Sequence, residues 1–332
     1  MHSRTLYDRD LRRKLLGTAS AVALLALTQT PEQAHAQDSG QHIWLDLTGQ
    51  YDMNSGKRTV YGEPFDNGSE DHQFFPLIGQ KAGGDGTIGL TLQEDEWYFN
   101  LAFNYGRTGT SRAEFSSSYD TYKYRSTVKI GRYHHYADGE ARHNESHKML
   151  DFTIGQDVGL GMFGMDGTSI LSAGVRWANF DATTIGRFFY GENKYSYPGG
   201  SFLYNVYNTE FNREVHQTFN GIGPMISWKG STPLADPAWS FEWGASAAIL
   251  FGPHSIHGFN APDWSRNASV PQAGGYLGIG WHCPDWPLKL TAGYNINASW
   301  NVLPQVTDTD ERRRGLDRIT QGPFLRATIQ VE

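Results

Sequence analysis

A period-two alternation of apolar and polar side chains recurs along most of this chain and constrains its fold more than any other feature. Apolar residues occupy every second position from Trp239 to Phe251 and again from Leu288 to Trp300, with mostly small or polar residues between them. Successive side chains of a strand point to opposite faces, so the pattern predicts strands with one apolar and one polar face. Ten segments show it: 43–52, 88–92, 97–105, 150–155, 171–177, 216–229, 239–251, 277–281, 288–300 and 324–331.

The length of these segments favours a membrane-spanning sheet. Strands of water-soluble domains usually have about 5–6 residues, whereas a tilted membrane-spanning strand needs about 9–11. Aromatic residues end several of the apolar faces, as at the two lipid–water boundaries of a barrel: Trp97, Tyr105, Trp281, Tyr294 and Trp300. In lipid only a closed sheet pairs every backbone group. The prediction is therefore an all-β, transmembrane, antiparallel up-and-down β-barrel, and the alternative is an extracellular β-sandwich.

The connections between segments alternate in length. Short ones lie at 94–96, 160–168, 230–237 and 282–287, and long ones at 53–84, 107–148, 180–215, 252–269 and 301–320. Short turns on one rim and long loops on the other are typical of outer-membrane barrels, with the turns periplasmic and the loops extracellular. Residues 122–130 also alternate inside one long connection, and the aromatic-rich 180–215 connection has room for a hairpin. The expected strand number is therefore 10 to 12.

The N-terminus has the three parts of a secretory signal peptide. Five basic residues precede the apolar stretch Leu15–Leu27, and Ala34-His35-Ala36 forms a small-x-small cleavage signal. Residues 1–36 are therefore predicted to be removed, leaving residues 37–332 as a single barrel domain. The expected location is the outer membrane of a Gram-negative bacterium.

Composition excludes several other classes of protein. The formal net charge of −7 is opposite to that of a nucleic-acid-binding protein. The single cysteine rules out a disulfide framework. After the N-terminal stretch, no apolar run approaches the ~18 residues of a membrane-spanning helix.

Strand parity also assigns the side chains that face the barrel interior. The charged members of this set are the candidate site residues: Asp46, Asp151, Arg176, Glu242, Lys289 and Arg326. About eight strands leave room only for side chains and 16–18 enclose an open channel, so 10 to 12 strands predict at most a narrow pore. Mixed charge disfavours strong ion selectivity, and it equally suits a closed network of ion pairs.

Residues outside this set give only weak sequence signals of a metal-binding or catalytic site. Residues 134–147 contain four histidines among acidic residues, a composition found in metal sites but also in solvated loops, and we expect the loop. The pairs Ser146 with His147 and Asp263 with His257 lack a discernible nucleophile–base–orienter arrangement. We therefore expect no catalytic residues, metal or cofactor.

Two regions carry a family resemblance. The first joins Leu150-Asp151-Phe152-Thr153-Ile154-Gly155 to Ala173-Gly174-Val175-Arg176-Trp177-Ala178. The second joins Phe219-Asn220-Gly221-Ile222-Gly223-Pro224 to the Gly/Ala-rich strand Trp243–Gly252. Together they resemble the Legionella-type major outer membrane protein family, whose members are pore-forming barrels. The matching motifs are structural, so the resemblance bears on activity only by association.

The expected function is passive diffusion of small hydrophilic solutes through the barrel. Expected partners are outer-membrane lipid and lipopolysaccharide, the barrel-insertion machinery and the solutes, with self-association into a homo-oligomer left open. The alternatives are a non-conducting barrel that binds surfaces through its long loops, acting as an adhesin, and a hydrolase with its site at the rim.

Overall fold

The computed structural model describes residues 42–60, 65–66, 73–74, 77–159, 167–196, 201–258, 264–304 and 315–331. The expected signal peptide, residues 1–36, lies outside these ranges. No helix in the described part of the chain is long and apolar enough to cross a membrane.

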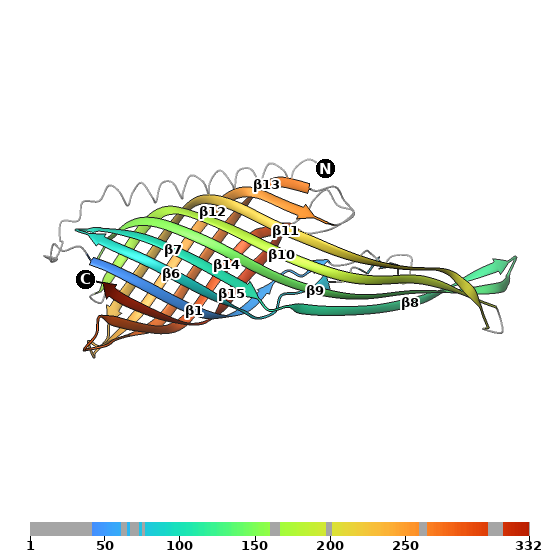
Figure 1. Ribbon diagram of the computed structural model, residues 1–332, viewed down its shortest axis with the longest axis horizontal. Coiled ribbons are helices and arrows are strands. Elements are labelled where there is room, and N and C mark those ends of the chain that lie inside the picture. The colour runs from blue at the N-terminus through green and yellow to red at the C-terminus, as the bar shows by residue number, and fades with distance from the viewer. Residues whose placement is uncertain are drawn as a thin grey trace.

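Ten antiparallel strands close into a barrel (Figure 1). Each strand pairs with the next in the order β1, β6, β7, β9, β10, β11, β12, β13, β14, β15, and β15 pairs back with β1. The predicted all-β barrel is confirmed, with the lowest strand number of the predicted range. The bounds are β1 His42–Gly56, β6 Gly83–Glu94, β7 Trp97–Thr108, β9 Val128–Asp157, β10 Thr168–Ser196, β11 Phe202–Pro233, β12 Trp239–His257, β13 Trp264–His282, β14 Leu288–Pro304 and β15 Gly315–Val331.

Two small pairs of strands lie in the 53–84 connection. β2 (Thr59–Val60) pairs with β5 (Leu77–Ile78), and β3 (Phe65–Asp66) pairs with β4 (Gln73–Phe74). Ile78 is 2% exposed and joins a buried cluster with Ala141 and Phe188. This connection therefore packs onto β9 and β10.

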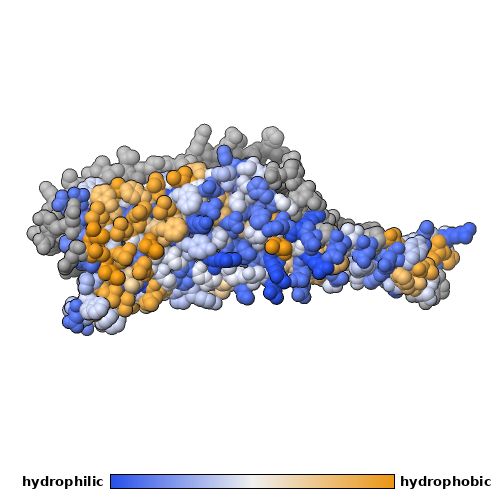
Figure 2. Space-filling model, in the orientation of Figure 1, coloured by the Kyte–Doolittle hydropathy of each residue, from blue (hydrophilic) through white to orange (hydrophobic). Residues whose placement is uncertain are grey.

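The register aligns the apolar faces into one outward band. Leu45 pairs with Leu90, which pairs with Leu101, which pairs with Phe152. The last three side chains are 44–46% exposed. Figure 2 shows this band near the end of the molecule where the short turns lie. Because residues of one parity meet across each strand pair, the alternation read from the sequence becomes a continuous apolar ring.

Three strands continue far beyond this band. β9, β10 and β11 have 30, 29 and 32 residues, and β8 (Ser111–Arg125) pairs with the outer half of β9 (Figure 1). We call the parts of these strands outside the band the extension. The prediction of long loops at 107–148 and 180–215 was therefore wrong, because strands fill most of both segments. One face of the inner part of the extension is buried, since Ala137, Ala141 and Phe188 are at most 1% exposed, but small and polar residues such as Gly139 and His143 share that face, so it shows no period-two pattern of polarity.

The alternating stretch 122–130 lies at the outer end of this extension. It is not one strand, since it crosses the hairpin between β8 and β9, where Ser126 has a φ of 54°. The sequence predicts a loop for the histidine-rich segment 134–147, and this prediction was wrong, because the whole segment lies within β9.

Candidate functional site

The barrel interior contains the six charged residues that parity selected. All six lie on the face opposite the apolar band. The structure joins them into two ion pairs, Asp151 with Arg176 and Glu242 with Lys289. Asp46 and Arg326 belong to neither ion pair and have other contacts. Asp46 accepts a hydrogen bond of 2.5 Å from the Thr328 hydroxyl.

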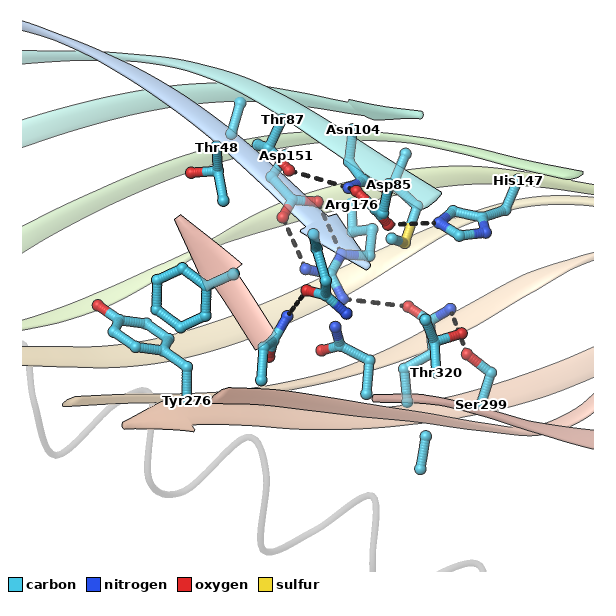
Figure 3. Close-up of a pocket in the computed structure, with 18 of the residues that line it drawn as sticks. Thr48, Asp85, Thr87, Asn104, His147, Asp151, Arg176, Tyr276, Ser299 and Thr320 are labelled. Atoms are coloured by element: carbon cyan, nitrogen blue, oxygen red, sulfur yellow. Dashed lines mark hydrogen bonds and ion pairs between the residues drawn. The ribbon is translucent and has the colours of Figure 1, made fainter. Parts of the chain in front are cut away.

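The Arg176–Asp151 pair lines the cavities of the interior (Figure 3). Nε and Nη2 of Arg176 donate to the two carboxylate oxygens of Asp151 at 2.7 and 2.6 Å, a bidentate arrangement that fixes both side chains. Nη1 donates to Gln272 on β13 at 3.2 Å, and Gln272 donates to Ser299 on β14 at 3.1 Å. The chain of contacts thus links β9 and β10 to strands that they do not pair with in the sheet.

Arg326 is held by aromatic rings. Its guanidinium carbon lies 4.7 Å from the ring centre of Tyr276 and 5.4 Å from that of Phe324. Its Nε donates to the Thr48 hydroxyl at 3.2 Å. A cation over a ring face is attracted by the ring quadrupole, so this positive charge is stabilised although no carboxylate of the described residues pairs with it directly.

Glu242 and Lys289 lie nearer the short turns. Oε1 of Glu242 forms the ion pair with Lys289 and also accepts hydrogen bonds from the hydroxyls of Ser231 and Ser240, both at 2.7 Å. Glu242 is 7% exposed. Both charges of the pair are therefore neutralised within the barrel wall.

A second charged cluster, which the sequence did not reveal, lies beyond the apolar band. Arg318 on β15 donates to both oxygens of Glu145 on β9 at 2.7 Å, and three strands separate β9 from β15 in the sheet on this side. Nε2 of His143 lies 2.8 Å from the Glu145 carboxylate, and the Gln80 side chain donates a hydrogen bond of 2.6 Å to the same carboxylate. The Arg318–Glu145 pair therefore crosses the interior.

This cluster is buried and strongly coupled. Arg318, Glu145 and His143 are 5%, 6% and 1% exposed. Burial alone would raise the pKa of Glu145. The hydrogen bond with His143 and the charge and hydrogen bonds of Arg318 outweigh burial and lower the pKa to about 2. Glu145 is therefore a carboxylate across the physiological pH range.

A carboxylate–imidazole pair lies beside this cluster. Nε2 of His147 is 3.0 Å from Oδ2 of Asp85, whose other oxygen accepts a hydrogen bond from Asn104 (Figure 3). Gly106 makes room for the ring, since a Cβ at that position would collide with the His147 imidazole. Burial, and then the charge of Asp85, raise the pKa of the nearby Asp52 to about 6.

Sequence reasoning did not place Glu145, Arg318, Asp85 or His147 in the interior, and it considered His147 only in a pair with Ser146 and within the histidine-rich segment. His143, Glu145 and His147 share one parity, but Asn144 and Ser146 between them are polar too, so no alternation marks the inner face. Contacts between residues far apart in the chain leave no local signal.

The structure does not support the two residue pairs that were considered as hydrolytic sites. Ser146 and His147 are neighbours in a strand, so their side chains point to opposite faces. Asp263 lies outside the described residues. Within the described ranges, no group of three His, Cys, Asp or Glu side chains is arranged to hold a metal ion. His134 instead lies 2.9 Å from Asp120, and His135 lies 3.1 Å from Glu192.

Apolar side chains fill much of the remaining interior. A buried cluster gathers residues from six neighbouring strands, β10 to β15, and Phe219, Leu250, Val270, Val302 and Leu316 in it are fully buried. Polar cavities of about 180 and 150 Å³ lie along the interior, and both are lined by Asp151, Arg176 and Tyr276. Each has room for several water molecules. The described interior therefore combines packed apolar side chains with polar cavities.

Comparisons with known proteins identify no family. No family model matches the chain, and no curated protein matches it. Among solved structures, the outer membrane protease OmpT from Escherichia coli is 12% identical with a TM-score of 0.45, covering 91% of this chain and 100% of that one. The translocator domain of the autotransporter NalP from Neisseria meningitidis is 10% identical with a TM-score of 0.27, covering 98% of this chain and 96% of that one. The Pseudomonas putida toluene transporter TodX is 7% identical with a TM-score of 0.23, covering 89% and 90%. At these values the similarities carry no argument about activity, and the fold rests on the strand pairing described above.

Proposed function

We propose that this chain is a barrel of the Gram-negative outer membrane that displays its four-stranded extension as a binding surface, without a chemical step. The observation that carries the proposal is strand length. A membrane-spanning strand needs about 9–11 residues, whereas β9, β10 and β11 have 30, 29 and 32. Most of each strand therefore serves something outside the bilayer.

The outward band supports the membrane location. Leu47, Leu90, Leu101, Phe103 and Phe152 are 43–46% exposed. A contiguous ring of such side chains is unfavourable in water and matches the hydrocarbon core of a bilayer. Within this proposal, outer-membrane lipid and lipopolysaccharide surround the band and the barrel-insertion machinery recognises the chain.

The packed interior disfavours an open pore. The cluster around Phe219 and the Arg318–Glu145 pair occupy the interior beyond the larger cavity, and the side chains involved are at most 9% exposed. A water-filled channel would leave such groups hydrated.

A narrow pore for small hydrophilic solutes is the second candidate. Its support is the pair of polar cavities lined by Asp151, Arg176 and Asn295, which lie in line along the barrel. Such a pore requires the outer cluster to open, and its mixed charge predicts weak ion selectivity.

Planar-bilayer recordings of refolded residues 37–332 separate the two candidates. We expect a folded, heat-modifiable protein that inserts without conductance steps. Steady steps proportional to salt concentration would refute the closed barrel and establish the pore. A useful control opens the interior deliberately. The double variant Glu145→Ala and Arg318→Ala removes the crossing pair and should conduct more than wild type if the cavities can be connected.

Removing the extension tests the binding role. The strand register gives a matched cut, because Arg112 pairs with Arg142, Arg142 with Ile185, and Ile185 with Glu214. Joining Arg112 to Arg142 and Ile185 to Glu214 through Asn-Gly turns removes both outer hairpins at one level. The shortened barrel should fold and lose binding to surfaces that wild type binds. Unchanged binding would place the function elsewhere.

A further inference from the structure

We propose that the outer tip of the extension binds the surface of a second lipid bilayer that carries anionic headgroups. The inference rests on the proposed function and names the partner of that binding surface. The tip comprises residues 121–133, 193–196 and 201–206.

The tip exposes an unusual amount of apolar and aromatic surface for the end of a strand pair in water. Figure 2 shows orange and pale side chains gathered at this end, separated from the barrel band by a hydrophilic stretch. The exposed fractions lie between 36% and 63% for Tyr122, Tyr124, Val128, Ile130, Phe202, Leu203, Tyr204 and Val206. Exposed apolar patches rimmed by polar residues mark interaction sites.

The charge of the tip is opposite to that of the whole chain. Lys123, Arg125, Lys129, Arg132 and Lys194 lie within its segments and outnumber the flanking Asp120 and Glu192, of which Asp120 pairs with Arg132 at 3.8 Å, while the chain has a net charge of −7. This asymmetry creates a local positive potential that attracts an anionic surface.

Cations and rings are already arranged together at the tip. Nζ of Lys129 lies 3.9 Å from the ring centre of Tyr122, and the Arg132 guanidinium lies 4.7 Å from that of Tyr195. Nζ of Lys194 donates to the Tyr204 hydroxyl at 3.0 Å. Tyrosine and lysine combined in this way suit the headgroup layer, where the ring enters the interface and the ammonium group stays beside phosphate.

The combination favours lipid over a polyanionic glycan. A sulfated polysaccharide would attract the cations of the tip but offers no apolar phase for Val128, Ile130, Phe202 or Leu203. A bilayer surface satisfies both sets of side chains at once.

The membrane around the barrel is too distant to be this partner. Val128 at the tip and Leu150, where the outward apolar band begins on β9, are separated by 22 positions. At about 3.3 Å per residue this is roughly 70 Å of strand. Figure 1 shows the extension running along the long axis away from the barrel. The tip therefore faces another vesicle or cell.

Vesicle co-flotation tests this proposal. Residues 37–332 are placed in nanodiscs of phosphatidylcholine, so that the surrounding lipid carries no net charge. The discs are mixed with vesicles of phosphatidylcholine alone or with 30% phosphatidylglycerol (about one anionic lipid in three). We expect flotation with the anionic vesicles that weakens as salt increases, because electrostatic attraction is screened.

Three variants assign the effect to the tip. A charge variant carries Lys123→Gln, Arg125→Gln and Lys129→Gln. Each cation near an anionic surface strengthens partitioning roughly fivefold, so this variant should bind on the order of 100-fold more weakly. An apolar variant, with Ile130→Ser, Phe202→Ser and Leu203→Ser, should also lose affinity. The matched control removes three exposed cations outside the extension, through Arg58→Gln, Lys81→Gln and Arg266→Gln, and should bind like wild type.

The outcomes separate this proposal from the proposed function. Selective loss in the two tip variants, with folding verified by heat modifiability and circular dichroism, supports it. Equal flotation with neutral and anionic vesicles, or an equal loss in the control, overturns it. Capture by immobilised heparin without vesicle binding also overturns the lipid partner but leaves a surface-binding barrel standing. Conductance steps from wild type would instead refute the proposed function itself.

Discussion

Replacing Arg318 by methionine should destabilise the barrel strongly. Arg318 is 5% exposed and donates two hydrogen bonds of 2.7 Å to the Glu145 carboxylate. Methionine retains much of the side-chain volume but removes the charge and all donors. Glu145, 6% exposed, would then be left as a buried anion with His143 and Gln80 as its remaining side-chain partners.

The magnitude follows from two independent considerations. Breaking a buried ion pair by removing one partner costs about 3–5 kcal/mol, because the other charge stays buried and uncompensated. The pKa of Glu145 gives a similar figure. A pKa lowered from 4.5 to about 2 corresponds to roughly 3 kcal/mol favouring the charged form. That stabilisation is present above about pH 4.5 and is lost as the pH falls towards 2.

Urea unfolding of the refolded barrel in lipid vesicles, followed by tryptophan fluorescence, measures the effect. Arg318→Met should lower the free energy of unfolding at pH 7 by about 3–5 kcal/mol. The double variant with Glu145→Gln should recover a substantial part, because no buried charge remains unpaired. Arg187→Met is the matched control. Its ion pair with Glu210 is 57% and 41% exposed, so the unfolding midpoint should not change.

Two results would refute this reasoning. One is a loss below about 1 kcal/mol for Arg318→Met, the value expected of an exposed pair. The other is additivity of Arg318→Met and Glu145→Gln, because residues that interact directly must show a coupling energy in a double-mutant cycle.

Three further changes test other parts of the structure. Phe219→Ala removes a fully buried ring from the apolar cluster and should cost about 3–5 kcal/mol in urea unfolding, whereas a loss under 1 kcal/mol would mean that the cluster is loosely packed. Gly174→Ala places a Cβ against the backbone carbonyl of Phe152 and should lower stability by about 1–3 kcal/mol, and an unchanged midpoint would contradict that approach of the two strands. The pKa of Asp52 is raised to about 6, so its protonated form stabilises the fold below about pH 4 and this contribution disappears as the pH rises through 6. Asp52→Asn should therefore flatten the wild-type decline of the urea midpoint between pH 4 and 6, and an identical decline in both proteins would exclude Asp52 as its source.

The membrane-level strands could be predicted from the sequence because two different solvents surround them. Leu101 and Phe103 face outward while Asn100 and Asn104 face the interior. The sequence therefore alternates between apolar and polar residues with a period of two. Parity alone placed Asp151, Arg176, Glu242 and Lys289 on the inner face. Their pairing required the register between strands, which sequence periodicity does not contain.

The extension escaped prediction for the complementary reason. Beyond the apolar band, the buried face of β9 carries small and polar residues such as Ala137, Gly139 and His143, so neither face of these strands stands out as apolar in the sequence. Polar residues on both faces resemble a loop in sequence, although backbone pairing continues without interruption from Asp157 to Gly131 on β9.

The packing of the interior was likewise decided by tertiary structure. The expected strand number and the mixed charge of the inner face left two alternatives, a hydrated narrow pore and a closed network of charges. Glu145 and Arg318 are 173 positions apart and meet because the barrel closes, and closure also brings apolar residues of six strands together over the polar cavities. The sequence by itself determined which face each membrane-level side chain takes, since that depends only on neighbours two positions away. Which side chains meet inside depends on curvature, register and closure, and these exist only in the folded barrel.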